Sequence, residues 1–360
     1  MGNLSRNSNW KRLHDKKSMQ RNVSHRNWLR AKRRSFEGIP KKERRLKSEM
    51  QTLFYDYLKI RVPKVLSLID NYESVLKFIQ ELQDAYRNKK KVFVLMNSME
   101  SFTGDGLIIL LSNVVLFKSA NIPFNGDYPK KKDVRERLMR TSFYDALYKF
   151  DYANESHYDL TKNDFFTHAN KNVDSDLTAR LIAHNSYYLW DDERRCTGVQ
   201  RIFLELMQNT NNHASLKQGE KHWWLHVSKA DNPKRLCFSF IDYGMGIFES
   251  LANKDVKSKF FRWAEKMLPI LNPKDHCVLL QAILNGTFHS TVTNKPYRGK
   301  GLPGIFNTFV KHKISRLIII SNDVFSEASC GKFININHKL NGTFVYFEVD
   351  ATCQNLPKAA

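Results

Sequence analysis

Residues 240–250 read FIDYGMGIFES, and this short stretch combines an acid, two glycines and a run of β-forming residues. The residues that lead into it, RLCFSFID, alternate apolar and polar side chains, as a half-buried β-strand does. The strand is predicted to end at Asp242, after which Gly244 and Gly246 allow backbone turns that a side chain would obstruct. This pattern predicts a polar-ligand site at the edge of a sheet. An ordinary turn has the same composition, so the neighbouring segments decide between the two.

Composition limits the possible classes of protein. The chain has 360 residues, 42% of them hydrophobic, which is enough for two domains with an appendage. Its net charge of +22 predicts a polyanionic partner. The five cysteines form no CxxC pair, which favours free thiols in a reducing cytosol over a metal site. The most apolar run, 107–117, is too short to span a bilayer, and the N-terminal residues MGNLSR include no apolar signal region. We therefore expect a soluble, cytoplasmic protein without membrane attachment.

Residues 1–50 are predicted to form a basic arm that is disordered or partly helical. This segment has 16 lysines and arginines against four acidic residues. Trp10 and Trp28 lie among the cations, and such aromatic side chains can stack on bases while lysine and arginine contact phosphates. The arm thus indicates DNA or RNA as a partner. A solubilising tail, or an arm that docks on an acidic protein, has the same composition.

Residues 51–150 are predicted to contain a helical segment and then a small α/β unit. Apolar residues recur at helical spacing in 53–60 and in 65–86, on either side of Pro63. The α/β unit is expected to start with a buried strand at 90–98. A glycine turn, an apolar helix and an amphipathic helix at 131–147 complete it.

The glycine turn of this unit, TGDGL at 103–107, resembles a turn of STAS domains in anti-sigma-factor antagonists. In that family the turn reads Asp-Ser-Ser/Thr-Gly-Leu, and the serine after the aspartate accepts a phosphoryl group. The matching position here is Gly104, which has no hydroxyl. The resemblance therefore implies a scaffold that docks a protein partner without this phosphorylation. An unrelated α/β cap is the alternative.

The third segment, 151–360, contains a predicted helix at 197–215 that carries polar residues on one face. Glu205, Asn209 and His213 follow each other at intervals of four, so their side chains leave the same side of the helix. Amide oxygens are suitable ligands for Mg²⁺, and a carboxylate can orient an attacking water. The spacing thus indicates a site for a divalent ion and phosphates, with a solvent-facing stripe as the alternative.

Further segments surround this helix in the sequence. Residues 221–242 are predicted to form a hairpin that ends at Asp242. Gly299 and Gly301 precede a predicted helix, and a glycine-rich entry to a helix presents backbone N–H groups to an anion. Strands are expected at 315–323 and 341–350.

The order of these segments resembles the GHKL ATPase superfamily over residues 174–350. This superfamily includes histidine kinases, gyrase-type topoisomerases, MutL repair proteins, ninety-kilodalton heat-shock chaperones and anti-sigma-factor kinases. Its motifs match, in order, Glu205 and Asn209; Asp242, Gly244, Gly246 and Ile247; Gly299, Gly301 and Leu302; and Gly342 and Thr343. The resemblance implies the α/β (α+β) class, with a Bergerat-type α/β sandwich over 151–360 that follows the STAS-like unit and the basic arm.

The resemblance also implies a role for each matched residue. Asp242 accepts a hydrogen bond from the adenine amine, and Thr343 supports the water network beside it. Asn209 ligates Mg²⁺, and Glu205 serves as the general base. The other expected nucleotide contacts are His213, Gly244, Gly246, Ile247, Arg298, Gly299, Lys300, Gly301 and Leu302. Residues 248–297 are expected to form a mobile lid.

The implied function is a Mg²⁺-dependent ATPase that acts as a nucleotide-controlled switch. One alternative is a protein Ser/Thr kinase of the anti-sigma type; another is a nucleic-acid-binding scaffold with a non-catalytic nucleotide pocket. His184 precedes the helix at 197–215, but it lacks the acid and the Arg-x-Pro run that accompany an acceptor histidine in histidine kinases. Histidine autophosphorylation is therefore not expected. Family precedent is compatible with a homodimer.

Overall fold

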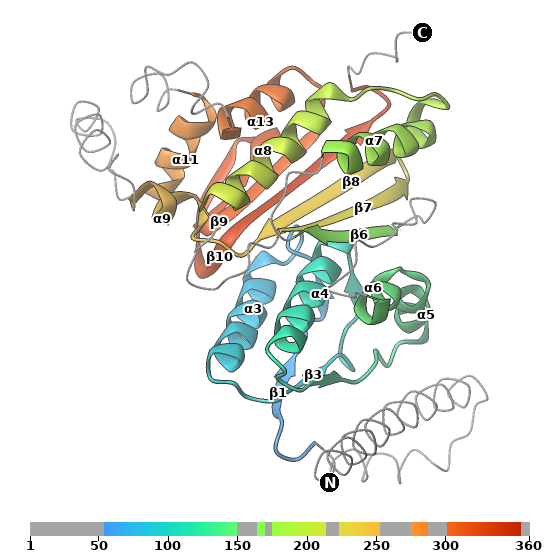
Figure 1. Ribbon diagram of the computed structural model, residues 1–360, viewed down its shortest axis with the longest axis vertical. Helices are drawn as coiled ribbons and strands as arrows, with labels where there is room; N and C mark the ends of the chain where they lie inside the picture. The colour runs from blue at the N-terminus through green and yellow to red at the C-terminus, as the bar shows by residue number, and fades with distance from the viewer. Residues whose placement is uncertain are drawn as a thin grey trace, which may run out of the picture. The chain divides into compact units, whose positions relative to one another are not determined.

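The computed structural model describes residues 54–149, 164–169, 175–213, 223–252, 275–286 and 301–353. The chain divides into two units, 1–56 and 57–360, and the elements below all belong to the second. Their class is mixed α and β, with parallel and antiparallel sheets (Figure 1).

The N-terminal part of this unit, residues 57–149, contains a three-stranded parallel sheet in the order β1-β3-β5. Two helices, α3 and α4, connect its strands, and the right-handedness of such crossovers places both on one face of the sheet. The elements are β1 (Leu58–Arg61), β2 (Val65–Leu66), α3 (Tyr72–Arg87), β3 (Val92–Leu95), β4 (Ser101–Phe102), α4 (Gly104–Ser119), β5 (Phe124–Gly126), α5 (Lys132–Arg140) and α6 (Phe143–Lys149).

The predicted buried strand at 90–98 is confirmed as β3, but the predicted helix at 53–60 is wrong. Residues Leu58–Arg61 form a strand that pairs with β3, with Ile60 opposite Val94. The periodicity of a run this short does not separate helix from strand, and pairing with a buried neighbour decides the outcome.

The amphipathic helix predicted at 131–147 is two helices, α5 and α6. The chain leaves the helical conformation at Thr141, whose φ of −69° and ψ of 159° are extended. The hydroxyl of Thr141 donates a hydrogen bond of 2.7 Å to the carbonyl of Leu138 in the last turn of α5. This local bond gives the backbone an alternative to continuing the helix.

The C-terminal part, residues 164–353, contains a five-stranded antiparallel sheet in the order β6-β7-β8-β10-β9. The predicted hairpin is confirmed as β7 and β8, with Asp231 opposite Lys234 and a cis Asn232–Pro233 bond in the turn. The strands are β6 (Asp164–Ala169), β7 (Trp223–Asp231), β8 (Lys234–Asp242), β9 (Arg316–Glu327) and β10 (Lys332–Asp350).

The last strand is longer than predicted. It begins at Lys332 instead of near residue 341, after a single 3-10 turn at Ala328–Cys330. Gly342 and Thr343 therefore lie inside the strand, where the pairing with β9 shifts register. Gly342 has a φ of +138°, and such a value inside a strand is accessible mainly to glycine.

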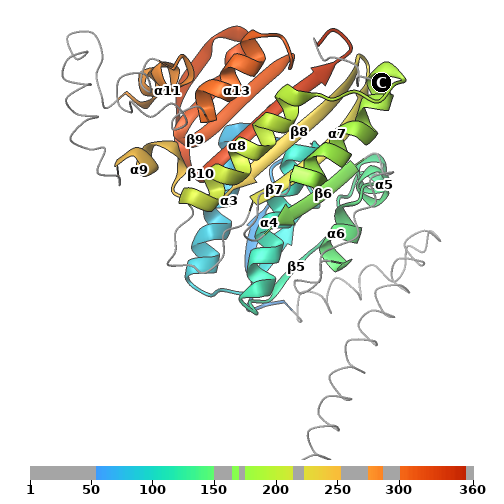
Figure 2. The same ribbon diagram turned by 45° about the horizontal axis from the view of Figure 1, so that its top comes forward.

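Helices cover one face of this sheet (Figures 1 and 2). They are α7 (Ser175–Trp190), α8 (Thr197–His213), α11 (His276–Leu284) and α13 (Gly301–Val310), while the short α9 (Gly246–Ala252) follows β8. Alternate residues of β8, such as Phe238 and Phe240, share a buried core with Phe203 of α8. The predicted helix at 197–215 is thus confirmed as α8.

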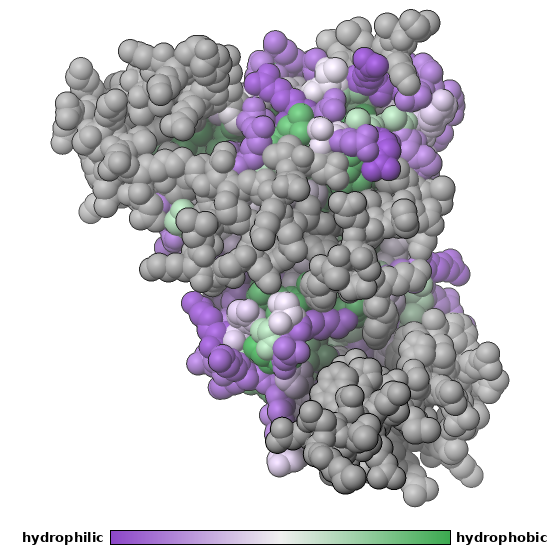
Figure 3. Space-filling model, in the orientation of Figure 1, coloured by the Kyte–Doolittle hydropathy of each residue, from purple (hydrophilic) through white to green (hydrophobic). Residues whose placement is uncertain are grey.

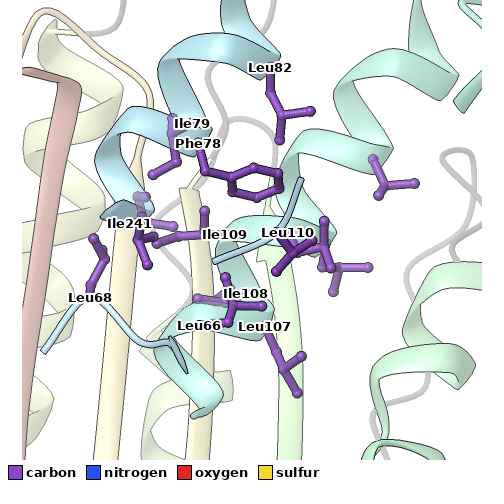
Figure 4. Packing of buried hydrophobic residues seen from close by; sticks show 14 of the residues in the cluster. Leu66, Leu68, Phe78, Ile79, Leu82, Leu107, Ile108, Ile109, Leu110 and Ile241 are labelled. Atoms are coloured by element: carbon purple, nitrogen blue, oxygen red, sulfur yellow. The ribbon is translucent and has the colours of Figure 1, made fainter. Parts of the chain in front are cut away.

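The opposite face of the same sheet packs against α3 and α4. Ile241 of β8 belongs to one core with Ile79 of α3, Ile109 of α4 and the connecting residues Leu66 and Leu68 (Figure 4). Because α4 is apolar on every side, it can be buried between the two sheets. The N-terminal and C-terminal parts are therefore joined by a shared core.

Hydrophilic side chains cover most of the described surface on the face shown in Figure 3. Among the described residues, the large apolar side chains that are exposed are Tyr55, Leu58, Tyr187 and Val310. None of the helices in the described ranges combines the length and the apolar character needed to cross a bilayer.

Candidate functional site

Helix α8 presents two polar side chains beside the start of another helix. Its apolar side, which includes Phe203 and Leu206, is buried against the sheet. Glu205 and Asn209 lie one turn apart and are only partly buried. Both therefore remain accessible to groups that lie alongside α8.

The first residue of α13, Gly301, lies against these two side chains. A β-carbon at Gly301 would stand 3.3 Å from Nδ2 of Asn209 and 3.4 Å from Oε2 of Glu205. The first N–H groups of a helix such as α13 have no partner within the helix, and they lie at the positive end of the helix dipole. The structure thus brings together a carboxylate, a carboxamide and a helix N-terminus that sequence reasoning predicted to meet.

Asp242 and Thr343 face each other across the β8–β10 pair. Asp242 alternates with Phe240, and Thr343 alternates with Val345, and both of these apolar residues belong to the core beneath α8. Because successive side chains of a strand point to opposite faces, Asp242 and Thr343 lie on the face that α8 covers. Asp242 and Thr343 therefore lie on the same side of the sheet as helix α8, which carries Glu205 and Asn209.

The Asp242 carboxyl group is buried, with 9% of the residue exposed. Its Oδ1 accepts a hydrogen bond of 3.0 Å from the backbone N–H of Gly244. Burial raises the pKa of Asp242 to about 7, against the opposing effect of hydrogen bonds from the backbone of Gly244 and Thr343. The group therefore changes charge near neutral pH.

Two residues of β9 hold the loop that follows Asp242. Ser321 Oγ accepts a 2.9 Å hydrogen bond from the N–H of Ile247 and donates one of 3.0 Å to the carbonyl of Gly342. Asn322 accepts from the N–H of Phe248 at 3.2 Å and donates to the carbonyl of Met245 at 2.9 Å. Sequence reasoning missed this pair, although its polar residues end the apolar run of the predicted strand at 315–323.

Two glycines of the predicted motifs are required by close approach. Gly246 has a φ of +74°, and a β-carbon there would lie 2.3 Å from Oδ1 of Asn322. A β-carbon at Gly342 would lie 1.9 Å from the carbonyl oxygen of Asp242. Both distances are shorter than any non-bonded contact, so glycine lets the Asn322 side chain approach residue 246 and the backbone of Asp242 approach residue 342.

The other residues predicted to contact the nucleotide lie partly within and partly outside the described residues. Ile247 and Leu302 lie next to Gly246 and Gly301 and pack against the core beneath α8. His213 is the last residue of α8, but its side chain lies outside the description. Arg298, Gly299, Lys300 and most of the expected lid at 248–297 also lie outside the described residues.

The STAS-like turn lies in a different environment. A β-carbon at Gly104 would stand 1.8 Å from Cε1 of His226 on β7, and one at Gly106 would stand 2.0 Å from the carbonyl oxygen of Leu66. Asp105 is almost fully buried, and its Oδ2 accepts a hydrogen bond of 2.6 Å from the N–H of Leu68. Burial raises the pKa of the Asp105 carboxyl group. This turn therefore packs against the five-stranded sheet.

Within the described residues, no cluster of three or more His, Cys, Asp or Glu side chains could hold a metal ion. All five cysteines are free thiols.

Neither the models of known protein families nor the curated proteins compared with this chain give a match.

Proposed function

We propose that residues 174–350 form an ATP-binding domain of the GHKL type, and that the protein is a Mg²⁺-dependent ATPase acting in the cytoplasm as a nucleotide-controlled switch. The observation that carries this proposal is the position of Gly301 beside the side chains of Glu205 and Asn209. Asp242 and Thr343 lie opposite each other on the same face of the sheet. A nucleotide placed between these groups would meet a base-binding acid at one end and a helix N-terminus at the other.

The Asp242 end fits the adenine base. An ionised carboxylate is an acceptor for the exocyclic amine of adenine, and charge-assisted hydrogen bonds are stronger than neutral ones. Oδ1 already accepts from Gly244. A carboxylate has about four lone-pair sites, so it can accept from a base as well. Asp242 would thus select a base that carries a donor at this position.

The Asn209 end fits magnesium and phosphates. The Asn209 amide provides an oxygen ligand, and Mg²⁺ commonly takes few protein ligands while phosphate oxygens and waters fill its other positions. When bound, the ion would neutralise phosphate charge. The N–H groups at the start of α13 would contact phosphate oxygens. Glu205, beside Gly301, would accept the proton of the attacking water.

Isothermal titration calorimetry with ATP and Mg²⁺ tests the binding part of the proposal. The wild type should bind, and Asp242→Asn should bind about 10- to 100-fold more weakly, because a hydrogen bond to a charged group is lost. Asp105→Asn is the matched control, since it changes a buried aspartate outside this layer and should leave the affinity unchanged. A folded wild type that does not bind millimolar ATP would refute the assignment.

Phosphate release tests the role of Glu205. Glu205→Gln should lower the rate of hydrolysis about 10²- to 10⁴-fold, the usual contribution of a general base, and should keep ATP binding. Glu81→Gln, at an exposed position of α3, is the control. If labelled γ-phosphate moved to a second protein instead of to water, the chain would be a Ser/Thr kinase.

The proposed switch acts on a protein partner through the N-terminal α/β part and on DNA or RNA through the basic arm. The turn at 103–107 is covered by β7, so the partner would contact another surface of that part. Nucleic-acid binding should fall steeply with salt and disappear when residues 1–50 are removed.

A further inference from the structure

Two polar residues lie in the middle of an otherwise apolar helix. Ser112 and Asn113 of α4 are 2% and 1% exposed, within the run 107–117 that is the most apolar of the chain. Burying a polar group without a hydrogen bond is unfavourable, so buried polar side chains have partners. The hydrogen-bond partner that Ser112 and Asn113 share therefore shows which neighbouring residue α4 holds.

Both side chains bind the hydroxyl of Tyr243. Ser112 Oγ lies 2.8 Å from Tyr243 Oη, and Nδ2 of Asn113 donates to the same oxygen at 3.0 Å. Each side chain also donates a 2.8 Å hydrogen bond to the carbonyl of Ile109. Since serine has one hydroxyl proton and Ile109 receives it, Tyr243 must donate to Ser112 and accept from Asn113. All the donors of this group are therefore used.

Tyr243 is the residue that directly follows Asp242. Its side chain points to the α4 side of the sheet, whereas Asp242 points to the α8 side. On the other side of the loop, Ser321 and Asn322 hold residues 245–248. The loop is thus fixed at both ends, once by β9 and once by α4.

We propose that Tyr243 is a positioning residue through which α4 sets the conformation of the nucleotide loop, so that the N-terminal α/β part is a component of the nucleotide site. This inference rests on the proposed function. Because coupling between sites is reciprocal, bound nucleotide would in turn stabilise the contact of Tyr243 with α4. The loop would thereby report nucleotide occupancy to the N-terminal part.

The test compares Tyr243→Phe with Tyr346→Phe. Tyr346 is buried on the same face of the sheet, and its hydroxyl donates to Glu348 instead of to α4. Hydrogen exchange of residues 244–248 and 108–113 is measured without nucleotide, and ATP affinity is measured by calorimetry. Tyr243→Phe should speed exchange in both segments and weaken ATP binding, each about 5- to 50-fold, because Ser112 and Asn113 lose their hydrogen bonds with the Tyr243 hydroxyl. Tyr346→Phe should change neither.

Unchanged loop exchange in folded Tyr243→Phe, or unchanged ATP affinity where the wild type binds, would overturn the inference. If Tyr243→Phe does not fold, Ser112→Ala removes the acceptor alone and is subject to the same criteria. A wild type that does not bind ATP would refute the proposed function. The exchange measurement would then still decide whether α4 positions the loop.

Discussion

Two turns of this chain have similar composition and different surroundings. The turn at 103–107 and the turn at 242–246 each contain two glycines and one buried aspartate. Each leads from a strand into a helix, from β4 into α4 and from β8 into α9. Because the residue patterns of the two turns are alike, any difference in what they can bind comes from their environments.

In the first turn, neighbouring atoms already occupy the space of a side chain. His226 fills the position next to Gly104, and the backbone of Leu66 fills the position next to Gly106. In the second turn, a β-carbon at Gly244 would stand 3.0 Å from Oδ1 of Asp242, and within 4 Å it would meet no other described residue beyond its chain neighbours. The glycines of the first turn thus permit packing, while Gly244 leaves space beside an acid. Only the second arrangement suits a ligand.

The largest effect is expected from Gly104→Ser, which introduces a hydroxyl at the position that matches the serine of STAS domains. The new β-carbon would overlap the ring of His226, and the buried helix α4 has little room to move. We expect the free energy of unfolding to fall by about 4 kcal/mol or more, as in severe overpacking. Chemical denaturation measures it.

A double-mutant cycle with His226→Ala tests whether the overlap is the cause. Removing the ring should recover part of the loss, with a coupling energy of about 1–3 kcal/mol. A stable Gly104→Ser variant with unchanged denaturation would show that the turn is not packed against β7, and the contrast between the turns would fail.

The next effect concerns the two buried aspartates. Desolvation raises the pKa of Asp242 to about 7 and also raises that of Asp105. A buried acid with a raised pKa destabilises the fold when it ionises. Asp242→Asn should therefore increase the free energy of unfolding at pH 8, on the order of 3 kcal/mol. Asp105→Asn should shift stability in the same direction, yet only Asp242→Asn should weaken ATP binding.

The pH dependence follows from the sign of the shift. Below about pH 4 the carboxyl group is protonated in both folded and unfolded chains, so Asp242→Asn and the wild type should differ little. Between about pH 4 and pH 7 the unfolded chain ionises first, and the wild type loses stability relative to the variant. Thermal unfolding at pH 4, 6 and 8 measures this difference. An equal difference at all three values would contradict the raised pKa.

Some regular elements of the C-terminal part could be predicted from the sequence because they are encoded locally. Helical spacing marks α8, and the turn residues mark the β7–β8 hairpin. The strand β1 could not be predicted, because pairing with β3 determines its conformation. The bonds of Tyr243 with Ser112 and Asn113 join residues that are distant in the sequence, and no local pattern encodes such a pair. The motifs of the candidate site could therefore be found in the sequence, whereas the residues that hold these motifs in place could not.

The smallest effect is expected from Gly244→Ala. Among the described residues beyond its chain neighbours, the methyl group would touch the Asp242 carboxylate alone. The lower entropy of the unfolded chain offsets part of this contact, so stability should change by less than about 1 kcal/mol. ATP affinity should nevertheless fall about 3- to 10-fold, since the methyl group takes up space beside the acid that binds the base. Calorimetry and denaturation on one sample measure both quantities.

Gly246→Ala is the matched variant, two residues further along. A residue other than glycine at a φ of +74° is strained, and its β-carbon would overlap Asn322, so this variant should lose about 2 kcal/mol of stability. The two alanines should thus separate an effect on ligand from an effect on folding. Gly244→Ala could instead lower stability as much as Gly246→Ala and leave ATP affinity unchanged. The second turn would then be a packed turn like the first, and no space for a ligand would remain beside Asp242.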